Sequence, residues 1–428
     1  MYVSGPRSMN LSRQDFLAQA YVVVLMIVTA ISLFSATPRP LDDHFLYQRF
    51  VESLARGDLD LTIPGFHGSD LFAVPLYWMT HSPLAQITAL MIVACFIPLV
   101  AFLAGRSIFR SIPAGVLLAS ILTMMPFISF VALRGWTGPG YFLLMLLTLW
   151  LGFRGSLWTG VVFGLAILTK PFAIGLLPLL LVIAPKNTSL WLRYRHLIIA
   201  PLLVLLYLAM QYIQAGRIFV GTHSEVSSIG IWQGPQRIFL NLAHALQILF
   251  SVHNYYYPDP GLTGPGNMMH TTPILIFLGL WGVFSPKEFF DEGHWTSEIG
   301  HRSADSPKSE VRTPKSVPLA LLSGAVLIFF MNALLDHMDH FYMEAGVLLL
   351  ILAAIPVLMK YPLWVPIVLA TLHFQWFYFY LQFQEIFHLT PVFFLVPATV
   401  DILFLIWCLV SLSTTRQMLH HTIFSSHS

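Results

Sequence analysis

Long apolar runs recur along the whole chain, and they constrain its fold more than any other feature of the sequence. A helix needs about 20 mainly apolar residues to cross a bilayer, and an open sheet cannot satisfy its backbone groups there. The sequence therefore predicts an all-α polytopic membrane protein with about 12 (11–13) transmembrane helices, in a single membrane-embedded domain over residues 1–428. The predicted spans are 17–36, 84–104, 112–132, 139–153, 156–169, 171–185, 197–214, 271–285, 317–335, 344–359, 362–381 and 391–412.

The composition excludes several other classes of protein. Of the 428 residues, 57% are hydrophobic and 10% are charged, whereas a soluble domain carries roughly 25% charged residues. These values exclude a soluble enzyme and a disordered chain, and a net charge of +2 is too small for binding nucleic acid along a surface. Cys95 and Cys408 both lie in apolar runs, so we expect them to pack as small hydrophobic side chains.

Lysine and arginine predict the orientation of the chain. With the N-terminus inside, the inner segments hold 15 of these residues and the outer segments hold 7, as the positive-inside rule requires. We therefore expect both termini on the inner side and the first apolar run as a retained anchor. The outer segments hold 12 acidic residues, so we expect the chemistry on the outer face.

Two long outer loops, 37–83 and 215–270, interrupt the predicted spans. Each carries a stretch with apolar residues at helical spacing, 42–56 in the first and 236–250 in the second. This spacing predicts short amphipathic helices at the membrane surface. The long inner loop, 286–316, mixes charges of both signs with Ser, Pro and Gly, and we expect it to be a flexible cytoplasmic connector.

An acidic pair, Asp42-Asp43, follows the first predicted span after five residues. Of two adjacent carboxylates at a membrane surface, one can accept a proton from an incoming hydroxyl while the other positions the substrate. The pair is therefore a candidate catalytic site. The alternative is a helix N-terminus, where acidic side chains interact favourably with the macrodipole.

Four basic residues of the outer segments are candidates for binding the phosphate of a donor. Lys170 follows the fifth predicted span, where a lysine can hold a phosphate as a point charge. The alternative for Lys170 is a side chain that snorkels to the interface. Arg134 lies in a tight outer turn, and Arg217 and Arg237 lie in the second long loop. Simple interfacial anchoring is an equally good interpretation of these three arginines.

The densest polar cluster lies between residues 336 and 344. On a helix, Asp336 and His340 would share a face, with a spacing that suits a divalent metal; hydrogen bonding to a sugar or phosphate is the alternative. The sequence specifies no cofactor, and a divalent metal at this cluster is left open. The candidate substrate or metal residues are Asp336, His337, Asp339, His340 and Tyr342, with His253 and Asp259 from a second polar, aromatic patch.

Three passages together resemble the GT-C class of membrane glycosyltransferases, which includes the protein O-mannosyltransferases and the bacterial aminoarabinose transferase that modifies lipid A. The first is 41–58, with its acidic pair, short helix, small residue and Gly. The second is 164–171, Gly-Leu-Ala-Ile-Leu-Thr-Lys-Pro, running on to Pro178. The third is His340-Phe341-Tyr342, where the class often has Arg-Tyr; the missing arginine puts a phosphate-binding role at this position in doubt.

The resemblance implies a donor sugar on a polyprenyl phosphate and a glycan, lipid or protein acceptor on the outer face. It implies an inverting displacement in which Asp42 or Asp43 activates the acceptor hydroxyl and basic residues stabilise the leaving phosphate. The two Asn-x-Ser/Thr sequons, at Asn10 and Asn187, fall on the predicted inner side. That placement is compatible with a bacterial inner membrane and a site that faces the periplasm.

Three other functions remain open. A polysaccharide polymerase or ligase would also use a polyprenyl-linked substrate at the outer face, but it would rely more on outer-loop arginines such as Arg217 and Arg237. A secondary transporter would show related halves and helices broken in mid-membrane, and the sequence shows neither. A non-catalytic scaffold predicts that Asp42 and Asp43 can be changed freely.

Overall fold

The computed structural model describes residues 13–40, 44–183, 194, 196–218, 236, 238–240, 242–243, 273–289, 316–333 and 344–407. Within these residues every regular element is a helix, which confirms the predicted all-α class. The elements, with η for a 3-10 helix, are α1 (Arg13–Phe34), α2 (His44–Ala55), η1 (Asp70–Phe72), α3 (Val74–Thr80), α4 (Ala85–Phe109), α5 (Ile112–Thr123), α6 (Pro126–Arg134), α7 (Gly138–Phe153), α8 (Trp158–Ile167), η2 (Pro171–Leu176), α9 (Leu177–Ile183), α11 (His196–Ala215), α14 (Pro273–Phe284), α15 (Pro286–Phe289), α17 (Ser316–Ala333), α18 (Glu344–Lys360), α19 (Trp364–Phe383) and η6 (Pro391–Phe394), after which the helix continues to Trp407.

Each of the twelve predicted spans contains helix among the described residues. Three helices are long and apolar enough to cross a membrane by themselves, namely Gln14–Phe34, Ala85–Phe109 and Leu197–Ala215. A fourth such span results if the bent pair α5–α6 is counted as one. The chain is therefore a polytopic membrane protein, and the full number of its spans stays a prediction.

Prolines shape three of the predicted spans. The span 112–132 bends by 50° between α5 and α6. Pro126 has no N–H to continue the helix, and it forces the preceding Met125 out of helical geometry, to a ψ of 106°. Pro171 and Pro391 each open a short 3-10 helix before the α-helix that follows.

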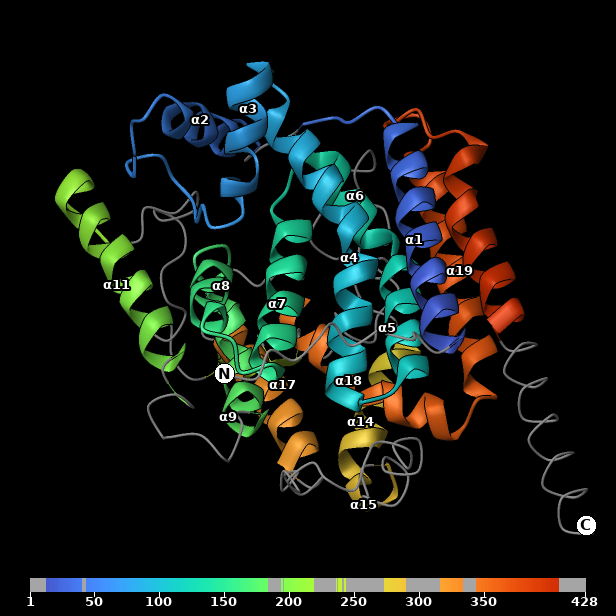
Figure 1. The fold of residues 1–428 in the computed structure, drawn as a ribbon. Helices are drawn as coiled ribbons and strands as arrows, with labels where there is room; N and C mark the ends of the chain where they lie inside the picture. The colour runs from blue at the N-terminus through green and yellow to red at the C-terminus, as the bar shows by residue number, and fades with distance from the viewer. Residues whose placement is uncertain are drawn as a thin grey trace, which may run out of the picture.

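The helices pack into one bundle in which α4 contacts α1, α5 and α7 (Figure 1). Elsewhere in the bundle, α14 and α17 pack against α18. The close approach of α14 to α18 depends on two glycines: a Cβ at Gly279 would collide with Leu350 O, and one at Gly282 with Ala353 O. Small residues of this kind let membrane helices gain van der Waals contact where no hydrophobic driving force brings them together.

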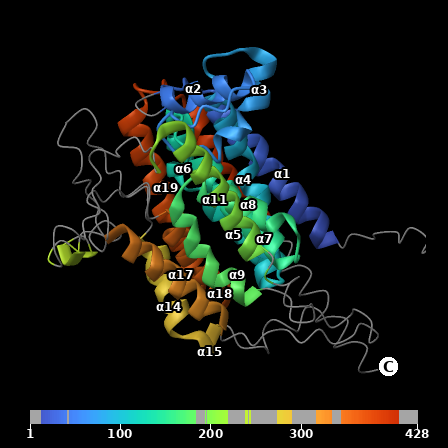
Figure 2. The same ribbon diagram turned by 90° about the vertical axis from the view of Figure 1, so that its left-hand side faces the viewer.

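The described parts of the segments that the sequence assigned to the outer face gather at one end of the bundle, next to α2 and α3 (Figures 1 and 2). The backbone N–H of Gly68 in the first loop donates to Leu168 O at the end of α8, at 2.9 Å. The Gln214 side chain, near the end of α11, accepts a hydrogen bond from Leu61 N–H at 2.8 Å. The structure thus brings these segments together, and their assignment to the periplasmic side stays a prediction.

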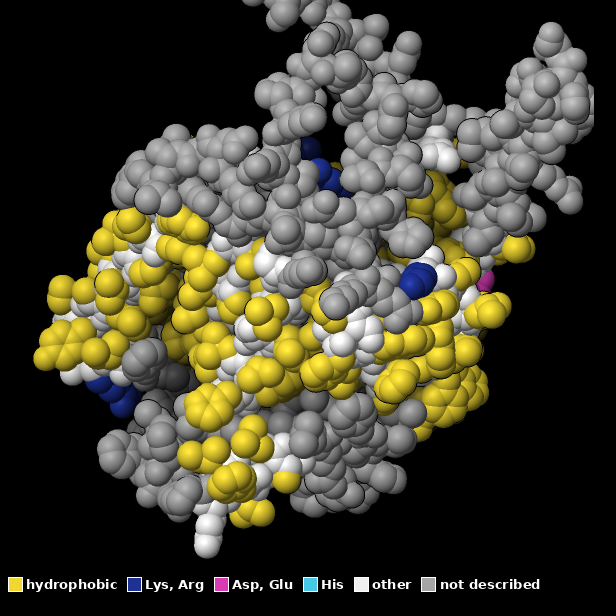
Figure 3. Space-filling view, turned by 90° about the horizontal axis from the view of Figure 1, so that it is seen from below, with side chains coloured by type: hydrophobic (Ala, Val, Ile, Leu, Met, Phe, Trp, Pro, Cys, Tyr) yellow, Lys and Arg dark blue, Asp and Glu magenta, His cyan; other side chains and the backbone are white. Residues whose placement is uncertain are grey.

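The opposite end of the bundle carries α9 and α15 (Figure 1). There, Arg106 and Asp15 join α4 to α1 through an ion pair of 2.7 Å. Seen from this end, the described surface is mostly hydrophobic, with few charged side chains (Figure 3). The inner loop 286–316 and the second outer loop 215–270, with its predicted helix 236–250, lie mostly outside the described residues.

Candidate functional site

The first outer loop folds back over the end of the bundle through α2 and η1. The amphipathic helix predicted over 42–56 is confirmed for His44–Ala55. Phe50 is buried and Phe45 is 65% exposed, so one face of α2 points inward. Phe50 stacks on the ring of His67 with centroids 3.9 Å apart and forms a small core that packs against α11. The loop is therefore a fixed part of the structure over this end.

A chain of hydrogen bonds runs beneath the loop through four side chains that are each at most 2% exposed. His44 Nδ1 lies 2.8 Å from Gln86 Oε1, and Gln86 Nε2 lies 3.5 Å from Asp70 Oδ1. The other carboxylate oxygen, Asp70 Oδ2, lies 2.8 Å from His67 Nδ1. We refer to His44, Gln86, Asp70 and His67 as the loop relay. It joins α2, α4 and η1.

The hydrogen bonds of Gln86 fix the position of the proton on His44. Gln86 Nε2 donates to Asp70, so Gln86 Oε1 can only accept, and His44 must donate from Nδ1. Burial lowers the pKa of His44 below its ordinary value of 6.5, against the weaker opposing effects of the bond to Gln86 and the charge of Asp70. His44 is therefore neutral at pH 7. His67 lies between two acceptors, with Nδ1 2.8 Å from Asp70 Oδ2 and Nε2 3.2 Å from Ile63 O.

Two glycines allow the loop to contact the bundle backbone directly. A Cβ at Gly68 would collide with Leu165 O and would lie 2.7 Å from Thr169 Oγ1. A Cβ at Gly140, in the first turn of α7, would collide with the side chain of Ser69. Because Asp70 follows these contacts immediately, η1 is fixed beside the turn that connects α8 to η2.

Lys170 lies in that turn and forms a buried ion pair. Its Nζ is 2.8 Å from Oε2 of Glu344, the first residue of α18, and the two side chains are 14% and 2% exposed. The same Nζ lies 5.4 Å from the centroid of the Tyr141 ring, which is fully buried. Charges removed from water at this depth are costly unless they are paired. Lys170 therefore presents its positive charge together with a carboxylate.

Arg134 ends α6 and is 5% exposed. The central carbon of its guanidinium lies 5.5 Å from the ring centroid of Phe130 and 5.1 Å from that of Trp136, within cation–π range. Gly135 ends the helix in a left-handed conformation with φ +75°. A Cβ at Gly135 would lie 2.6 Å from His44 Nδ1, so the turn that carries Arg134 contacts the loop relay directly.

Two of the predicted phosphate ligands, Lys170 and Arg134, thus lie at the end of the bundle that the first loop covers. Arg217, just after α11, is exposed at the same end. The other predicted site residues lie outside the described residues, and their roles stay predictions. They are Asp42, Asp43, Arg237, His253, Asp259, Asp336, His337, Asp339, His340 and Tyr342.

Metal binding is untested at the predicted cluster, because residues 336–343 are not described. Within the part of the chain that is described, no three His, Cys, Asp or Glu side chains are arranged to hold a metal ion.

The structure adds four residues to which sequence reasoning gave no role. Glu344 was only the last residue of the polar cluster 336–344, Asp70 counted only among the acidic residues of the outer segments, and Gln86 and Tyr141 lie at the starts of apolar runs. The hydroxyl of Tyr141 is buried and has no hydrogen-bond partner among the described residues. Gln86, Tyr141 and Glu344 lie at the edges of predicted spans, and that position was the available signal, since polar side chains are costly inside a membrane.

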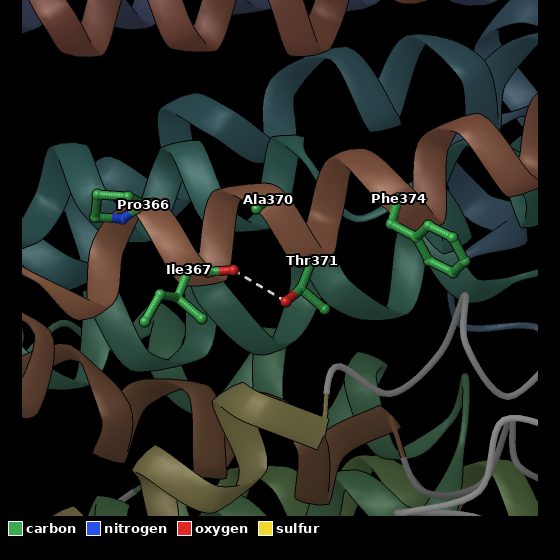
Figure 4. Close-up of a pocket in the computed structure, with 5 residues that line it drawn as sticks. All are labelled: Pro366, Ile367, Ala370, Thr371 and Phe374. Atoms are coloured by element: carbon green, nitrogen blue, oxygen red, sulfur yellow. Dashed lines mark hydrogen bonds between the residues drawn. The ribbon is translucent and has the colours of Figure 1, made fainter.

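A shallow apolar groove of about 510 Å³ on α19 lies apart from these residues (Figure 4). The hydroxyl of Thr371 donates to Ile367 O of its own helix at 2.9 Å, so it is already satisfied. The groove occupies the first half of α19, whereas the last residue, Phe383, packs against Phe130 near Arg134. The groove is lined by Pro366, Ile367, Ala370, Thr371 and Phe374.

The fold and the buried polar groups define an all-α polytopic membrane protein with a candidate site at one end of its bundle. Comparison with protein-family models and with curated proteins gives no match. Comparison with solved structures finds a similarity to the crystal structure of ArnT from Cupriavidus metallidurans bound to undecaprenyl phosphate. The two share 18% sequence identity at a TM-score of 0.45, over 82% of this chain and 62% of that one. This chain therefore spans less than two thirds of the length of that protein, and its function must be inferred from its own residues.

Proposed function

We propose that this chain is a GT-C-like membrane glycosyltransferase that moves a sugar from a polyprenyl-phosphate carrier to an acceptor hydroxyl. The observation that supports the proposal is the meeting of Lys170, Arg134 and the first-loop helix at one end of the bundle. In the sequence resemblance, these elements supply the leaving-group site and the catalytic loop. A bacterial inner membrane, with this end facing the periplasm, belongs to the same proposal.

The basic residues act on the leaving group. When the bond between the sugar carbon and the phosphate oxygen breaks, the phosphate leaves with an additional negative charge. A preorganised cation stabilises that charge most in the transition state. Lys170 is held by Glu344 at 2.8 Å and needs little reorganisation to contribute. Because Glu344 offsets part of the lysine's charge, the reaction needs a second cation, for which Arg134 is the candidate.

Asp42 or Asp43 acts as the base in this proposal. In an inverting displacement the acceptor oxygen attacks the sugar carbon on the face opposite the phosphate, while a carboxylate takes the hydroxyl proton. Residues on both sides of the pair contact the turn that carries Arg134. Arg39 N–H donates to Leu133 O at 2.9 Å, and His44 contacts Gly135. A loop held in this way provides the rigid support that a catalytic base requires.

Transfer from a panel of polyprenyl-phosphate sugars by the full chain in lipid nanodiscs tests the proposal. Lys170→Met should lower turnover roughly 10- to 100-fold, since a hydrogen bond to a charged group is worth about 1.5–3 kcal/mol. Lys360→Met is the matched control, because Lys360 ends α18 far from the candidate site, and it should keep full turnover. Equal turnover in the two variants would remove Lys170 from the site. A folded wild-type chain that transfers no sugar from any donor would contradict the proposal.

A polysaccharide polymerase or ligase that uses a polyprenyl-linked substrate is the second candidate. The exposed Arg217 at the same end of the bundle favours it, since such an enzyme relies on outer-loop arginines. In that case Arg217→Ala should abolish product formation, and Asp42→Asn and Asp43→Asn should leave it intact.

A further inference from the structure

The loop relay explains how the first loop is held in one orientation. His44 is the first residue of α2 and directly follows Asp43 in the sequence. We propose that Gln86 is a positioning residue: through the ring of His44 it fixes where α2 begins, and with it the approach of the acidic pair to the acceptor hydroxyl. The catalytic consequence rests on the proposed function, whereas the structural consequence rests on the geometry alone.

Gln86 holds α2 at two points that lie one helical turn apart. Its side-chain oxygen accepts from His44 Nδ1 at 2.8 Å, and its backbone N–H donates to Gln48 Oε1 at 3.0 Å. Residues four apart lie on the same face of a helix, so the two bonds together fix both the position and the axial rotation of α2. The Gln48 amide is itself held, because its Nε2 donates to Glu52 Oε1 at 3.0 Å.

Only an amide satisfies both sides of position 86. The side chain must accept from His44 and donate to Asp70 at the same time, which neither a carboxylate nor an apolar group can do. Asp70 is fixed in turn by the ring of His67, whose Nδ1 lies 2.8 Å from Asp70 Oδ2. All of these groups are buried, so a lost partner would leave an unsatisfied polar group that water cannot reach.

Substitutions at His44 separate the positioning contact from other effects of the ring. In His44→Asn the amide nitrogen occupies the place of Nδ1 and can still donate to Gln86. In His44→Gln the longer side chain places its amide nitrogen near the position of Nε2, so the bond that Nδ1 makes to Gln86 is lost. Gln86→Leu removes both side-chain bonds at similar volume. Tyr21→Phe is the matched control, because it removes a buried hydrogen bond of 2.6 Å to Ser120 elsewhere in the bundle.

Two measurements on the full chain in nanodiscs test the inference: hydrogen–deuterium exchange of residues 44–55 without substrate, and kcat and KM for the donor. Gln86→Leu and His44→Gln should speed exchange in α2 but not in α18, and should lower kcat at least 10-fold at unchanged KM. His44→Asn should keep slow exchange and most of kcat. A global loss of stability would speed exchange in α2 and α18 alike. Tyr21→Phe measures that global effect, because its lost hydrogen bond lies elsewhere in the bundle.

Slow α2 exchange and wild-type kcat in both Gln86→Leu and His44→Gln would overturn the inference, as would equal losses in His44→Asn and His44→Gln. A wild-type chain that transfers nothing, while the relay variants still speed exchange in α2, would contradict the proposed function and support the positioning by Gln86. The two failures are therefore distinguishable.

Discussion

At the scale of single residues, the polar groups of this protein work in buried sets. Lys170 with Glu344, and His44 with Gln86 and Asp70, each bring together side chains from different helices or loops. A buried ion pair adds little net stability, because the cost of removing both charges from water offsets their attraction. Folding alone therefore does not explain the pair of Lys170 and Glu344, and the role proposed for Lys170 on the leaving phosphate would explain it.

Lys170→Met should lower the free energy of unfolding by about 3–5 kcal/mol, because it removes the cation that faces the buried carboxylate of Glu344. Adding Glu344→Met should recover most of that loss, since two apolar side chains of similar volume then replace the pair. Thermal unfolding of the purified variants measures both effects. The double variant should keep the lowered turnover of Lys170→Met; recovery of stability and turnover together would show that Lys170 has only a structural role.

Acid should destabilise the protein through His44. Burial holds the pKa of His44 below 6.5, so the unfolded chain takes up a proton at a pH where the folded chain does not. Its contribution to the free energy of unfolding is therefore complete above pH 6.5 and is lost as the pH falls below that value. The unfolding midpoint of His44→Asn should fall less steeply than that of the wild type between about pH 7 and pH 5. Identical pH profiles would contradict a neutral, buried His44.

At the scale of elements, the first loop is the part of the molecule that links the separate polar groups. It contacts α4 through Gln86, α8 through Gly68 and α11 through Leu61. These contacts involve backbone groups and side-chain amides, of which Gln86 is buried. The loop is therefore expected to keep one orientation over the ends of the helices.

Gly68→Ala tests this docking, because the new Cβ would collide with Leu165 O, a backbone atom that cannot move aside. We expect a loss of about 1–3 kcal/mol in the free energy of unfolding, together with a fall in turnover as the loop shifts away from Lys170. Gly346→Ala is the control, because its Cβ would lie 3.3 Å from Phe329 Cζ, the end of a side chain that can move. Unfolding curves and transfer rates for both variants measure the difference, and equal behaviour would contradict tight docking.

At the scale of the whole molecule, the helices were predictable and their polar contacts were not. Apolar runs located helix in all twelve predicted spans, and Pro126, Pro171 and Pro391 stand where helices bend or begin. Lys170 and Glu344 are 174 positions apart, and His44 and Gln86 are 42 apart. Nothing in the local sequence says which distant polar group a buried side chain will meet, because that depends on how the bundle packs.

The last predicted span also holds a polar contact that the local sequence does not show. Asp401 lies inside the apolar run 391–412, where the local sequence offers no partner for its carboxylate. In the structure Asp401 Oδ2 lies 2.9 Å from His373 Nε2 of α19. Hydropathy located both helices, and only their packing against each other reveals the pair.

The most direct test of the central claim is the turnover of Asp42→Asn and Asp43→Asn beside the wild type, with polyprenyl-phosphate sugars as donors and the purified chain in nanodiscs. We expect transfer by the wild type and a loss of at least 100-fold in one of the two variants, each with a wild-type unfolding midpoint. Full turnover in both variants would contradict a first-loop base and the glycosyltransferase mechanism proposed for this end of the bundle.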